Sequence, residues 1–238
     1  MTKPIAITMG DPAGIGPEVI CKALAQKSPA ERKDILVIGS RPVLERADAL
    51  CGTDVLFTNF QSNDQDICLL DMPTTDVEVA PAGEVSKAGG EAAYTYVVKA
   101  AEMALAGEIS CIVTAPINKA ALHEAGHIYD GHTSLLSHLA GGIKSNMLLT
   151  SPTLSTIHVS THVSLADAIR RCTTKRVLEV IRAGDGHFKR LGLASPRIAV
   201  AGLNPHCGEA GMFGTEDNLQ VAPAVATARA EGINVVGP

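Results

Sequence analysis

The sequence predicts an α/β fold in which helices cover a largely parallel sheet. Along the 238 residues, apolar runs of strand length alternate with segments of helical periodicity. Hydrophobic residues make up 46% of the chain but aromatic residues only 3%, with no Trp, so the core must be built from Ala, Val, Ile and Leu. Such aliphatic runs are typical of parallel strands that are buried on both faces.

Six apolar runs are the expected strands. In chain order they are PIAITMG, ILVIG, CIVTAP, NMLLT, LSTIHVST and RIAVAGL, and the terminal INVVGP is expected to be a further short strand followed by a turn. Helical patterns lie between them, at 17–26, 41–50, 88–106, 118–125, 133–140, 175–191 and 216–230. The polar stretch TNFQSNDQD is either a domain boundary or a long loop, and the chain carries no repeat.

Charge and cysteine usage narrow the class of protein. A net charge of −5 gives no general electrostatic reason to bind nucleic acid. The start, MTKPIAITMGDPAG, lacks the apolar core of a signal peptide, and no stretch has the length and apolarity of a membrane span. The six Cys include no CxxC pair and indicate reduced thiols, so we expect a cytoplasmic protein.

The first stretch with chemical potential is GDPAGIGPE, which follows the strand PIAITM. Its three glycines permit a tight turn, and Pro17 suits the first position of a helix. A dinucleotide fingerprint would need Gly where Val19 stands, so the Rossmann interpretation is weak. The stretch is either a structural junction or an active-site loop whose polar groups are Asp11 and Glu18.

Two further loops offer groups that bind anions. In VTAPINKAAL, Asn118 stands where a helix cap belongs, and Lys119 is either a surface residue or a point charge for a phosphate or carboxylate. In YDGHTSLL, Thr133 is expected to cap the next helix, whose first N–H groups would face an anion. His132 beside them is either a solvated loop residue or a partner of that anion.

The segment HVSTH holds two His, four residues apart, in a run that is rich in β-branched residues. On a strand that separation spans about 13 Å, too far for one metal whose bonds are about 2 Å long. At most one of the pair is therefore a ligand, and His162 at the strand end is favoured over His158.

The loop GLNPHCGEAGMFGTED follows the strand RIAVA and contains Asn204, His206, Cys207 and Glu209. It lies at a strand's carboxyl edge, where α/β proteins place their ligands. A Gly-rich loop is costly to order, so this concentration of polar ligand residues favours a functional role.

HEAGH, residues 123–127, fits the H-E-x-x-H signature of zinc peptidases. The pattern NKAALHEAG instead predicts a short helix from the Asn118 cap, with Gly126 just beyond its end. His127 would then leave the helical face that His123 occupies, so we interpret the motif as a chance match.

Taken in this order, the motifs MGDPAGIGPE, TAPINKAAL, GHT, STHVSL and GLNPHCGE…GTE resemble those of the 4-hydroxythreonine-4-phosphate dehydrogenase family. The match runs from Thr8 to Pro238. Close relatives that act on 4-phospho-D-threonate or 4-phospho-D-erythronate carry the same motifs, so the motifs do not separate the substrates.

The resemblance implies a fold similar to isocitrate and isopropylmalate dehydrogenases, with two α/β/α domains flanking a cleft. It implies a homodimer with active sites at its interface, and NAD as hydride acceptor without GxGxxG. His162 and His206 match two of three divalent-metal ligands, the metal being Zn, Mg, Mn or Co. His132 and Thr133 match substrate-binding residues, and Lys119 and Asn118 are assigned to polar catalytic groups around the substrate.

The implied reaction is oxidation with decarboxylation of 4-phosphooxy-L-threonine to 3-amino-2-oxopropyl phosphate, in pyridoxal phosphate biosynthesis. The alternatives are 4-phospho-D-threonate or 4-phospho-D-erythronate 3-dehydrogenase, or an inactive fragment of such an enzyme. Ser134 replaces the family's usual Glu after GHT. The chain also ends about three-quarters of the way along a typical member, so we expect an incomplete two-domain enzyme whose third metal ligand and NAD site lie beyond Pro238.

Overall fold

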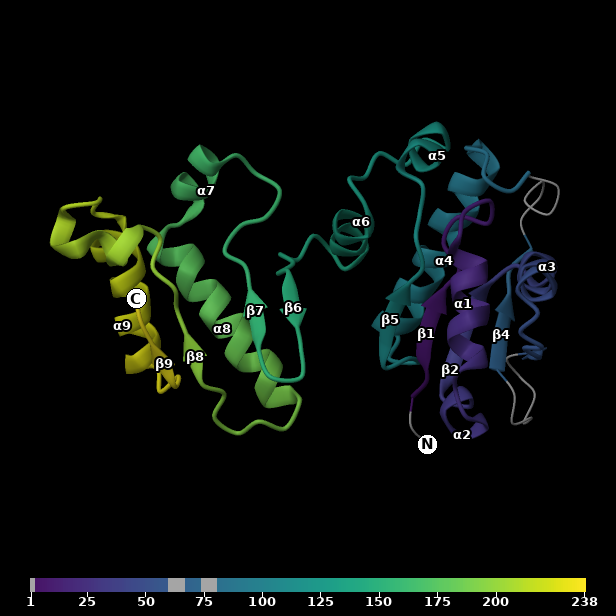
Figure 1. Cartoon of the computed structure of the whole chain (residues 1–238), viewed down its shortest axis with the longest axis horizontal. Helices are drawn as coiled ribbons and strands as arrows, with labels where there is room; N and C mark the ends of the chain where they lie inside the picture. Colours follow the sequence, from purple (N-terminus) through teal and green to yellow (C-terminus); the bar gives the residue numbers. More distant parts are fainter. Residues whose placement is uncertain (1–2, 60–66, 74–80) are drawn as a thin grey trace. The chain divides into compact units, whose positions relative to one another are not determined.

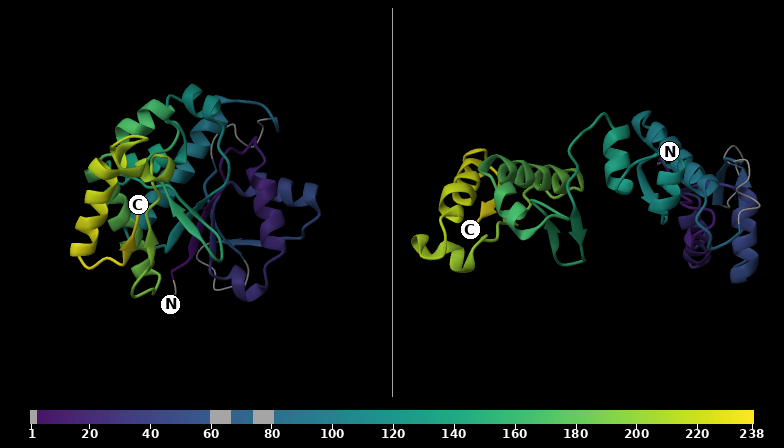
Figure 2. Two further views of the ribbon diagram at one scale, coloured as in Figure 1. Left: turned by 60° about the vertical axis from the view of Figure 1, so that its left-hand side comes forward. Right: turned by 90° about the horizontal axis from the view of Figure 1, so that it is seen from above.

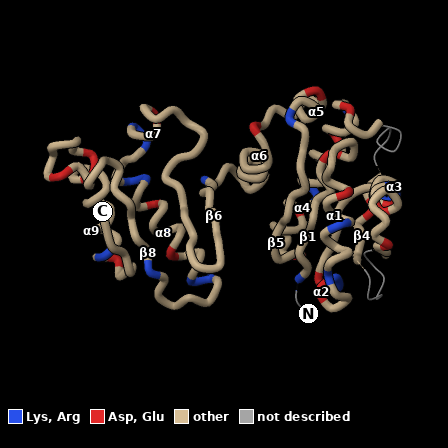
Figure 3. The backbone as a smooth tube through the Cα atoms, in the orientation of Figure 1, with Lys and Arg blue, Asp and Glu red and all other residues tan. Residues whose placement is uncertain are grey.

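The computed structural model describes residues 3–59, 67–73 and 81–238. The chain separates into two compact units, which we call unit 1 (residues 1–144) and unit 2 (residues 145–238). Figure 1 labels their helices and strands. Lys and Arg are interspersed with Asp and Glu along both units (Figure 3), as the small net charge of −5 would suggest.

Unit 1 is built on a five-stranded sheet with strand order β3-β4-β2-β1-β5, in which every pairing is parallel. The strands are β1 (Ile5–Thr8), β2 (Ile35–Gly39), β3 (Phe57–Asn59), β4 (Ile67–Asp71) and β5 (Cys111–Thr114). The helices are α1 (Gly16–Ala25), α2 (Pro29–Arg32), α3 (Arg41–Cys51), α4 (Lys87–Leu105), α5 (Lys119–Glu124) and α6 (His132–Leu139).

The core of unit 1 follows the aliphatic composition. Leu36, Val37 and Ile38 of β2 are all fully buried, as expected of a central parallel strand that is covered on both faces. Tyr96 of α4 is the largest fully buried side chain in the described chain. Helix α4 starts at Ser86, whose hydroxyl accepts a hydrogen bond from the N–H of Gly89, an N-cap that satisfies one open donor of the first turn.

The strand order creates a topological switch point at β1. From β1 the chain moves to β2 on one side, whereas after α4 it returns to β5 on the other side. In open α/β sheets, ligands bind outside the carboxyl ends of the strands at such a point. The loops after β1 (residues 9–15) and β5 (residues 115–118) both lie there.

Unit 2 contains two separate two-stranded sheets. Strands β6 (Leu148–Thr150) and β7 (Ser155–Ile157) are antiparallel, whereas β8 (Ile198–Ala199) and β9 (Val235–Val236) are parallel. The helical elements are α7 (Leu165–Arg171), α8 (Thr174–Arg190), the 3₁₀ segment η1 (Pro205–Gly211), the π-turn η2 (Asp217–Val221) and α9 (Ala222–Ala230). Helix α8 runs beside the strands (Figure 2), and a mainly apolar cavity of about 440 Å³ is lined by β7, α8 and β8.

The α/β class is confirmed, and several boundaries are corrected. Strand β7 ends at Ile157, and only two residues of RIAVAGL are strand, because neither run has a neighbour on both sides. Strands β3 and β4 were not expected; β3 has only three residues and includes the first two of the polar stretch TNFQSNDQD, and β4 follows that stretch directly. Because they pair with each other, that stretch connects two strands of unit 1; its residues 60–66 lie outside the described part.

The structure also bears on the expectations about the Cys residues and about membrane spans. All six Cys are free thiols. Among the described residues, no helix is long and apolar enough to cross a membrane. That the chain is an incomplete two-domain enzyme stays a prediction.

Candidate functional site

The loop after β1 is held against the loop after β5. The backbone N–H of Asp11 donates to the carbonyl of Pro116 at 3.0 Å. Gly10 has φ +73°, and a Cβ added there would lie 2.2 Å from the same carbonyl oxygen. Only glycine combines this left-handed backbone with so close an approach. The sequence GDP thus folds the first loop onto the second at the switch point.

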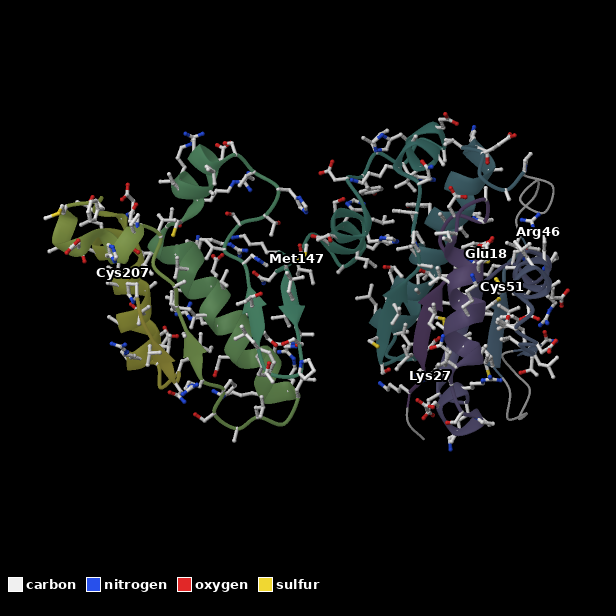
Figure 4. The ribbon with its side chains drawn as sticks, in the orientation of Figure 1. Glu18, Lys27, Arg46, Cys51, Met147 and Cys207 are labelled. Carbon is white, nitrogen blue, oxygen red and sulfur yellow. The ribbon has the colours of Figure 1, made fainter. Side chains whose placement is uncertain are left out.

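The two polar groups predicted in GDPAGIGPE have different roles. Asp11 is 3% exposed, and its Oδ1 accepts the N–H of Ala13 at 2.9 Å. Burial raises the pKa of this carboxyl, while the bond from Ala13 acts in the opposite direction. A Cβ on Gly89 would meet Asp11 Oδ1 at 2.6 Å, so the carboxyl packs against the first turn of α4 and stabilises the fold. Glu18 of α1 (Figure 4) has a buried Oε2 that meets no hydrogen-bond partner in the described residues.

A cavity of about 220 Å³ lies between these loops and the segment before α4. Glu84 and Asn118 supply polar side chains at its wall, and the lining residues are Asp11, Ala13, Gly14, Ile15, Gly83, Glu84, Pro116, Ile117 and Asn118. The N–H of Gly83 donates to the carbonyl of Ala13 at 2.7 Å and closes the cavity on that side. Asp11 lines this cavity, whereas Glu18 is not among its lining residues.

Asn118 caps α5 as expected: its Oδ1 accepts the N–H of Ala121 at 3.1 Å. The cap uses the side-chain oxygen, and the amide Nδ2 remains the donor of this side chain. Lys119 is the first residue of α5, and its Cε lies 3.9 Å from the position that a Cβ on Gly131 would take. Lys119 therefore extends along the segment that leads into α6.

His132 is the first residue of α6, and its ring N–H donates to the backbone carbonyl of Ala115, just after β5. Its Nε2 is buried and has no hydrogen-bond partner in the described part of the chain. Burial lowers the pKa of this imidazole, and the bond to Ala115 opposes that effect. Nε2 is therefore the ring nitrogen that a ligand could meet.

The prediction that Thr133 caps this helix is wrong. Helix α6 begins one residue earlier, with Gly131 at the N-cap position, and Thr133 is an exposed residue of the first turn. Gly131 has φ +152°, a backbone conformation that glycine adopts readily, and the chain turns there before His132. Ser134 donates its hydroxyl proton to the carbonyl of Gly131 at 3.1 Å, so it supports the helix start. The first-turn N–H groups remain the donors that could meet an anion.

The HEAGH pair does not form a metal site. Helix α5 ends at Glu124, and Gly126 has φ +93°. The N–H of His127 bonds to Leu122 and that of Gly126 to His123, which is a Schellman motif. The side chains then separate: His123 Nε2 lies 3.1 Å from the carbonyl of Tyr129, whereas the other imidazole stacks on Tyr94 and bonds to Glu91 at 2.8 Å.

In unit 2 the two predicted metal ligands share an unusual backbone. His162 has φ +55° and His206 has φ +52°, although neither is glycine. Both side chains are exposed. A left-handed backbone costs a non-glycine residue roughly 1–2 kcal/mol, and such residues gather at functional sites. The strand ends at Ile157, so His162 belongs to a loop before α7 and not to the strand end.

The loop 202–217 is the most strained part of the described chain. His206, Cys207, Gly208, Glu209 and Ala210 are consecutive and all left-handed; Cys207 is labelled in Figure 4. Four of the five are not glycine, so the surrounding structure must over-determine the conformation.

A single buried carboxylate fixes the base of this loop. Asp217, 1% exposed, accepts the N–H of Leu203 at 2.7 Å and that of Asn204 at 2.9 Å, one on each oxygen. Burial raises the pKa of Asp217, but these hydrogen bonds outweigh it and leave the pKa below its usual value. Glu216 accepts from Asn204 Nδ2 at 2.8 Å. Sequence reasoning missed Asp217; its signal was an Asp at the start of a helix, directly after a Gly-rich loop.

The donor chemistry of His162 and His206 suits a divalent metal, because imidazole is a good ligand for ions such as Zn. Two imidazoles are a partial set, since a catalytic zinc has three protein ligands. The described residues contain no group of three or more His, Cys, Asp or Glu that is arranged to hold a metal ion.

Comparison with known proteins groups this chain with one family. Residues 31–238 match the model of the pyridoxal phosphate biosynthetic protein PdxA. A D-threonate 4-phosphate dehydrogenase from Salmonella typhimurium is 44% identical over 246 residues, covering 100% of this chain and 74% of that protein. A 4-hydroxythreonine-4-phosphate dehydrogenase from Beijerinckia indica is 42% identical over 240 residues, covering 99% of this chain and 71% of that protein.

The fold agrees with the same group. The crystal structure of a 4-hydroxythreonine-4-phosphate dehydrogenase from Klebsiella pneumoniae superposes with a TM-score of 0.90 at 41% identity, covering 100% of this chain and 75% of that one. The α/β fold of this chain is therefore shared with a solved dehydrogenase structure.

Proposed function

We infer the function of this chain from its membership of a family: it belongs to the PdxA family of pyridoxal phosphate biosynthetic proteins, whose named relatives are dehydrogenases. It is therefore a dehydrogenase by class. We propose that it oxidises the C3 hydroxyl of a phosphorylated four-carbon hydroxy acid and passes the hydride to NAD⁺. The C–H and O–H bonds at C3 break, NADH forms, and the hydroxyl proton leaves to the medium.

The observation that carries the proposal is the placement of Lys119 and His132 in the segments that follow the carboxyl end of β5, each at the start of a helix. Lys119 extends toward Gly131, and His132 is fixed on Ala115 with its Nε2 unpartnered in the described chain. An ammonium group, an imidazole and the first-turn N–H groups of α6 together suit the phosphate or carboxylate of such a substrate. In this proposal Thr133 acts through its backbone N–H, and Asn118 mainly holds the loop.

His162 and His206 are the proposed metal ligands. Their support is the pair of exposed imidazoles on left-handed backbone, an arrangement that costs stability and needs a use. When bound, a divalent ion such as Zn, Mg, Mn or Co supplies Lewis-acid stabilisation of negative charge on substrate oxygens. The 3-keto acid that results from hydride transfer has its carboxylate β to a carbonyl and can lose CO₂.

We propose two candidate substrates, because the relatives include both D-threonate 4-phosphate dehydrogenases and 4-hydroxythreonine-4-phosphate dehydrogenases. 4-Phosphooxy-L-threonine would give 3-amino-2-oxopropyl phosphate, and D-threonate 4-phosphate is its alternative. NADH formation measured with each compound, as kcat/KM at matched metal concentration, distinguishes them. A preference of at least tenfold assigns the substrate, whereas activity with neither compound contradicts both assignments. The homodimer and the cytoplasmic location stay predictions.

A further inference from the structure

We propose that Asp217 is a positioning residue, whose carboxylate holds His206 in its left-handed conformation and thereby sets the affinity of the metal site. This inference rests on the proposed role of His206 as a metal ligand. It adds a residue that binds neither metal nor substrate and acts only through the backbone of the loop 202–217.

The first support is the geometry of the clamp. The two oxygens of Asp217 accept the N–H groups of Leu203 and Asn204, which are the residues that enter the left-handed run. Hydrogen bonds to an ionised carboxylate are roughly twice as strong as neutral ones. The run itself begins two residues later at His206, so the clamp fixes the backbone from which that imidazole projects.

The second support is the close packing of the loop around the carboxylate. A Cβ on Gly202 would meet Cys207 Sγ at 2.7 Å and Asp217 Oδ1 at 3.3 Å, and a Cβ on Gly208 would meet the carbonyl of Gly214 at 2.5 Å. The chain therefore folds tightly around the carboxylate on both sides. Within the loop, the N–H of Cys207 bonds to the carbonyl of Asn204 at 3.0 Å, which passes the constraint from the clamped residue to the neighbour of His206.

The third support is that the described hydrogen bonds of the carboxylate all involve this loop or the start of its own helix. Asp217 is buried, and the hydrogen bonds that its two oxygens accept in the described structure go to this loop and its own helix start. Its neighbour Glu216 accepts a hydrogen bond from Asn204 Nδ2, and the Asn204 side chain also helps to lower the pKa of Asp217. The strain of four left-handed non-glycine residues requires such an anchor, because nothing in their own geometry favours the conformation.

The test compares Asp217→Asn with Asp185→Asn in the full chain. Asp185 is a matched control, since it is also a buried carboxylate of unit 2, on α8, and bonds to Lys189 and not to the loop. The first readout is NMR, which gives the hydrogen-exchange rates of the Leu203 and Asn204 amides and the backbone chemical shifts of His206. The second readout is Co²⁺ affinity, measured from the visible absorption of the bound ion. The first needs no metal, and neither needs turnover.

For Asp217→Asn we expect both amides to exchange at least tenfold faster, the left-handed shifts of His206 to be lost, and Co²⁺ affinity to fall by about 10- to 100-fold, as for other supporting residues of metal sites. Asp185→Asn should leave all three unchanged, even if its thermal stability falls. A merely structural role would make the two variants alike. Unchanged exchange in Asp217→Asn, or released amides with wild-type Co²⁺ affinity, would overturn the inference.

His206→Ala separates this inference from the proposed function. If it binds Co²⁺ as tightly as the wild type, the ligand assignment fails, and the positioning role fails with it. If it loses affinity while Asp217→Asn does not, only the positioning role fails. Should Asp217→Asn not fold, Asp217→Glu keeps the charge but displaces the oxygens by one methylene. It should show faster exchange and a smaller loss of affinity, and wild-type affinity with fast exchange would contradict the inference.

Discussion

The imidazole of His132 donates a hydrogen bond to the backbone carbonyl of Ala115, the residue that follows β5. This bond joins the start of α6 to the carboxyl edge of the sheet in unit 1. It fixes the ring, and it leaves Nε2 buried without a partner in the described residues. A buried polar atom that meets no partner is costly, so its retention at a switch point favours a role toward a ligand.

His132→Ala should raise the KM for the phosphorylated substrate by about 10- to 100-fold, because a hydrogen bond to a charged group contributes about 1.5–3 kcal/mol. The measurement is initial-rate NADH formation over a range of substrate concentrations. His138→Ala is the control, since His138 lies on the same helix but is exposed and contacts only the ring of Tyr129 among the aromatic groups described. An equal KM for the two variants would remove His132 from the binding site.

The lowered pKa of His132 predicts a pH effect on stability. In the folded protein the neutral imidazole is favoured, so below the ordinary pKa of about 6.5 the unfolded chain takes up the proton first. Stability from this group is therefore present above that pH and is lost as the pH falls through the folded pKa. The free energy of unfolding of the wild type, minus that of His132→Gln, should decline between about pH 7 and pH 5. A difference that is constant with pH would show that the ring titrates normally.

The contact between the two switch-point loops predicts a large effect of Gly10→Ala. The added methyl would stand 2.2 Å from the carbonyl oxygen of Pro116, on a backbone at φ +73°. We expect a loss of about 3 kcal/mol or more in urea unfolding, from overpacking together with the left-handed backbone. Gly52→Ala is the matched control: its φ is +61°, with nothing within 4 Å, so it should lose only about 1 kcal/mol. Similar losses in the two variants would mean that the loops do not touch.

The separation of the HEAGH side chains predicts that Glu124 has no part in metal chemistry. Glu124→Gln should keep Co²⁺ affinity and the rate of NADH formation within about twofold of the wild type, because the His on either side bond to Tyr129 and Glu91. His162→Ala should lower both by at least about tenfold. The reverse pattern would restore the peptidase interpretation.

Much of the fold could be predicted from local pattern. Helix α5 begins at Lys119 after its cap Asn118 and ends before Gly126, as the cap and the glycine indicate. The start of α6 was misplaced, because Thr133 has a side-chain oxygen that could cap a helix and Gly131 has none, while the turn before His132 needs glycine. Capping propensity ranks residue types at a given N-cap position, but it does not show at which residue the helix will begin.

The site was harder to predict than the fold for a physical reason. His162 and His206 could be named from the family's motifs, but their left-handed backbone is set by long-range contacts. Asp217 acts on residues 13 and 14 positions earlier in the chain, and no short spacing marks such a pair. Strand β3 was missed because a three-residue strand carries almost no periodicity.

The most direct test of the account is the metal dependence of NADH formation. Metal-free protein is titrated with Co²⁺ in the presence of NAD⁺ and either D-threonate 4-phosphate or 4-phosphooxy-L-threonine. We predict a rate that rises from background and saturates with Co²⁺ for at least one substrate, and that stays at background in His162→Ala and His206→Ala. A wild-type rate that does not depend on Co²⁺, or that survives in both variants, would contradict the assignment of these two His as the metal ligands of a dehydrogenase.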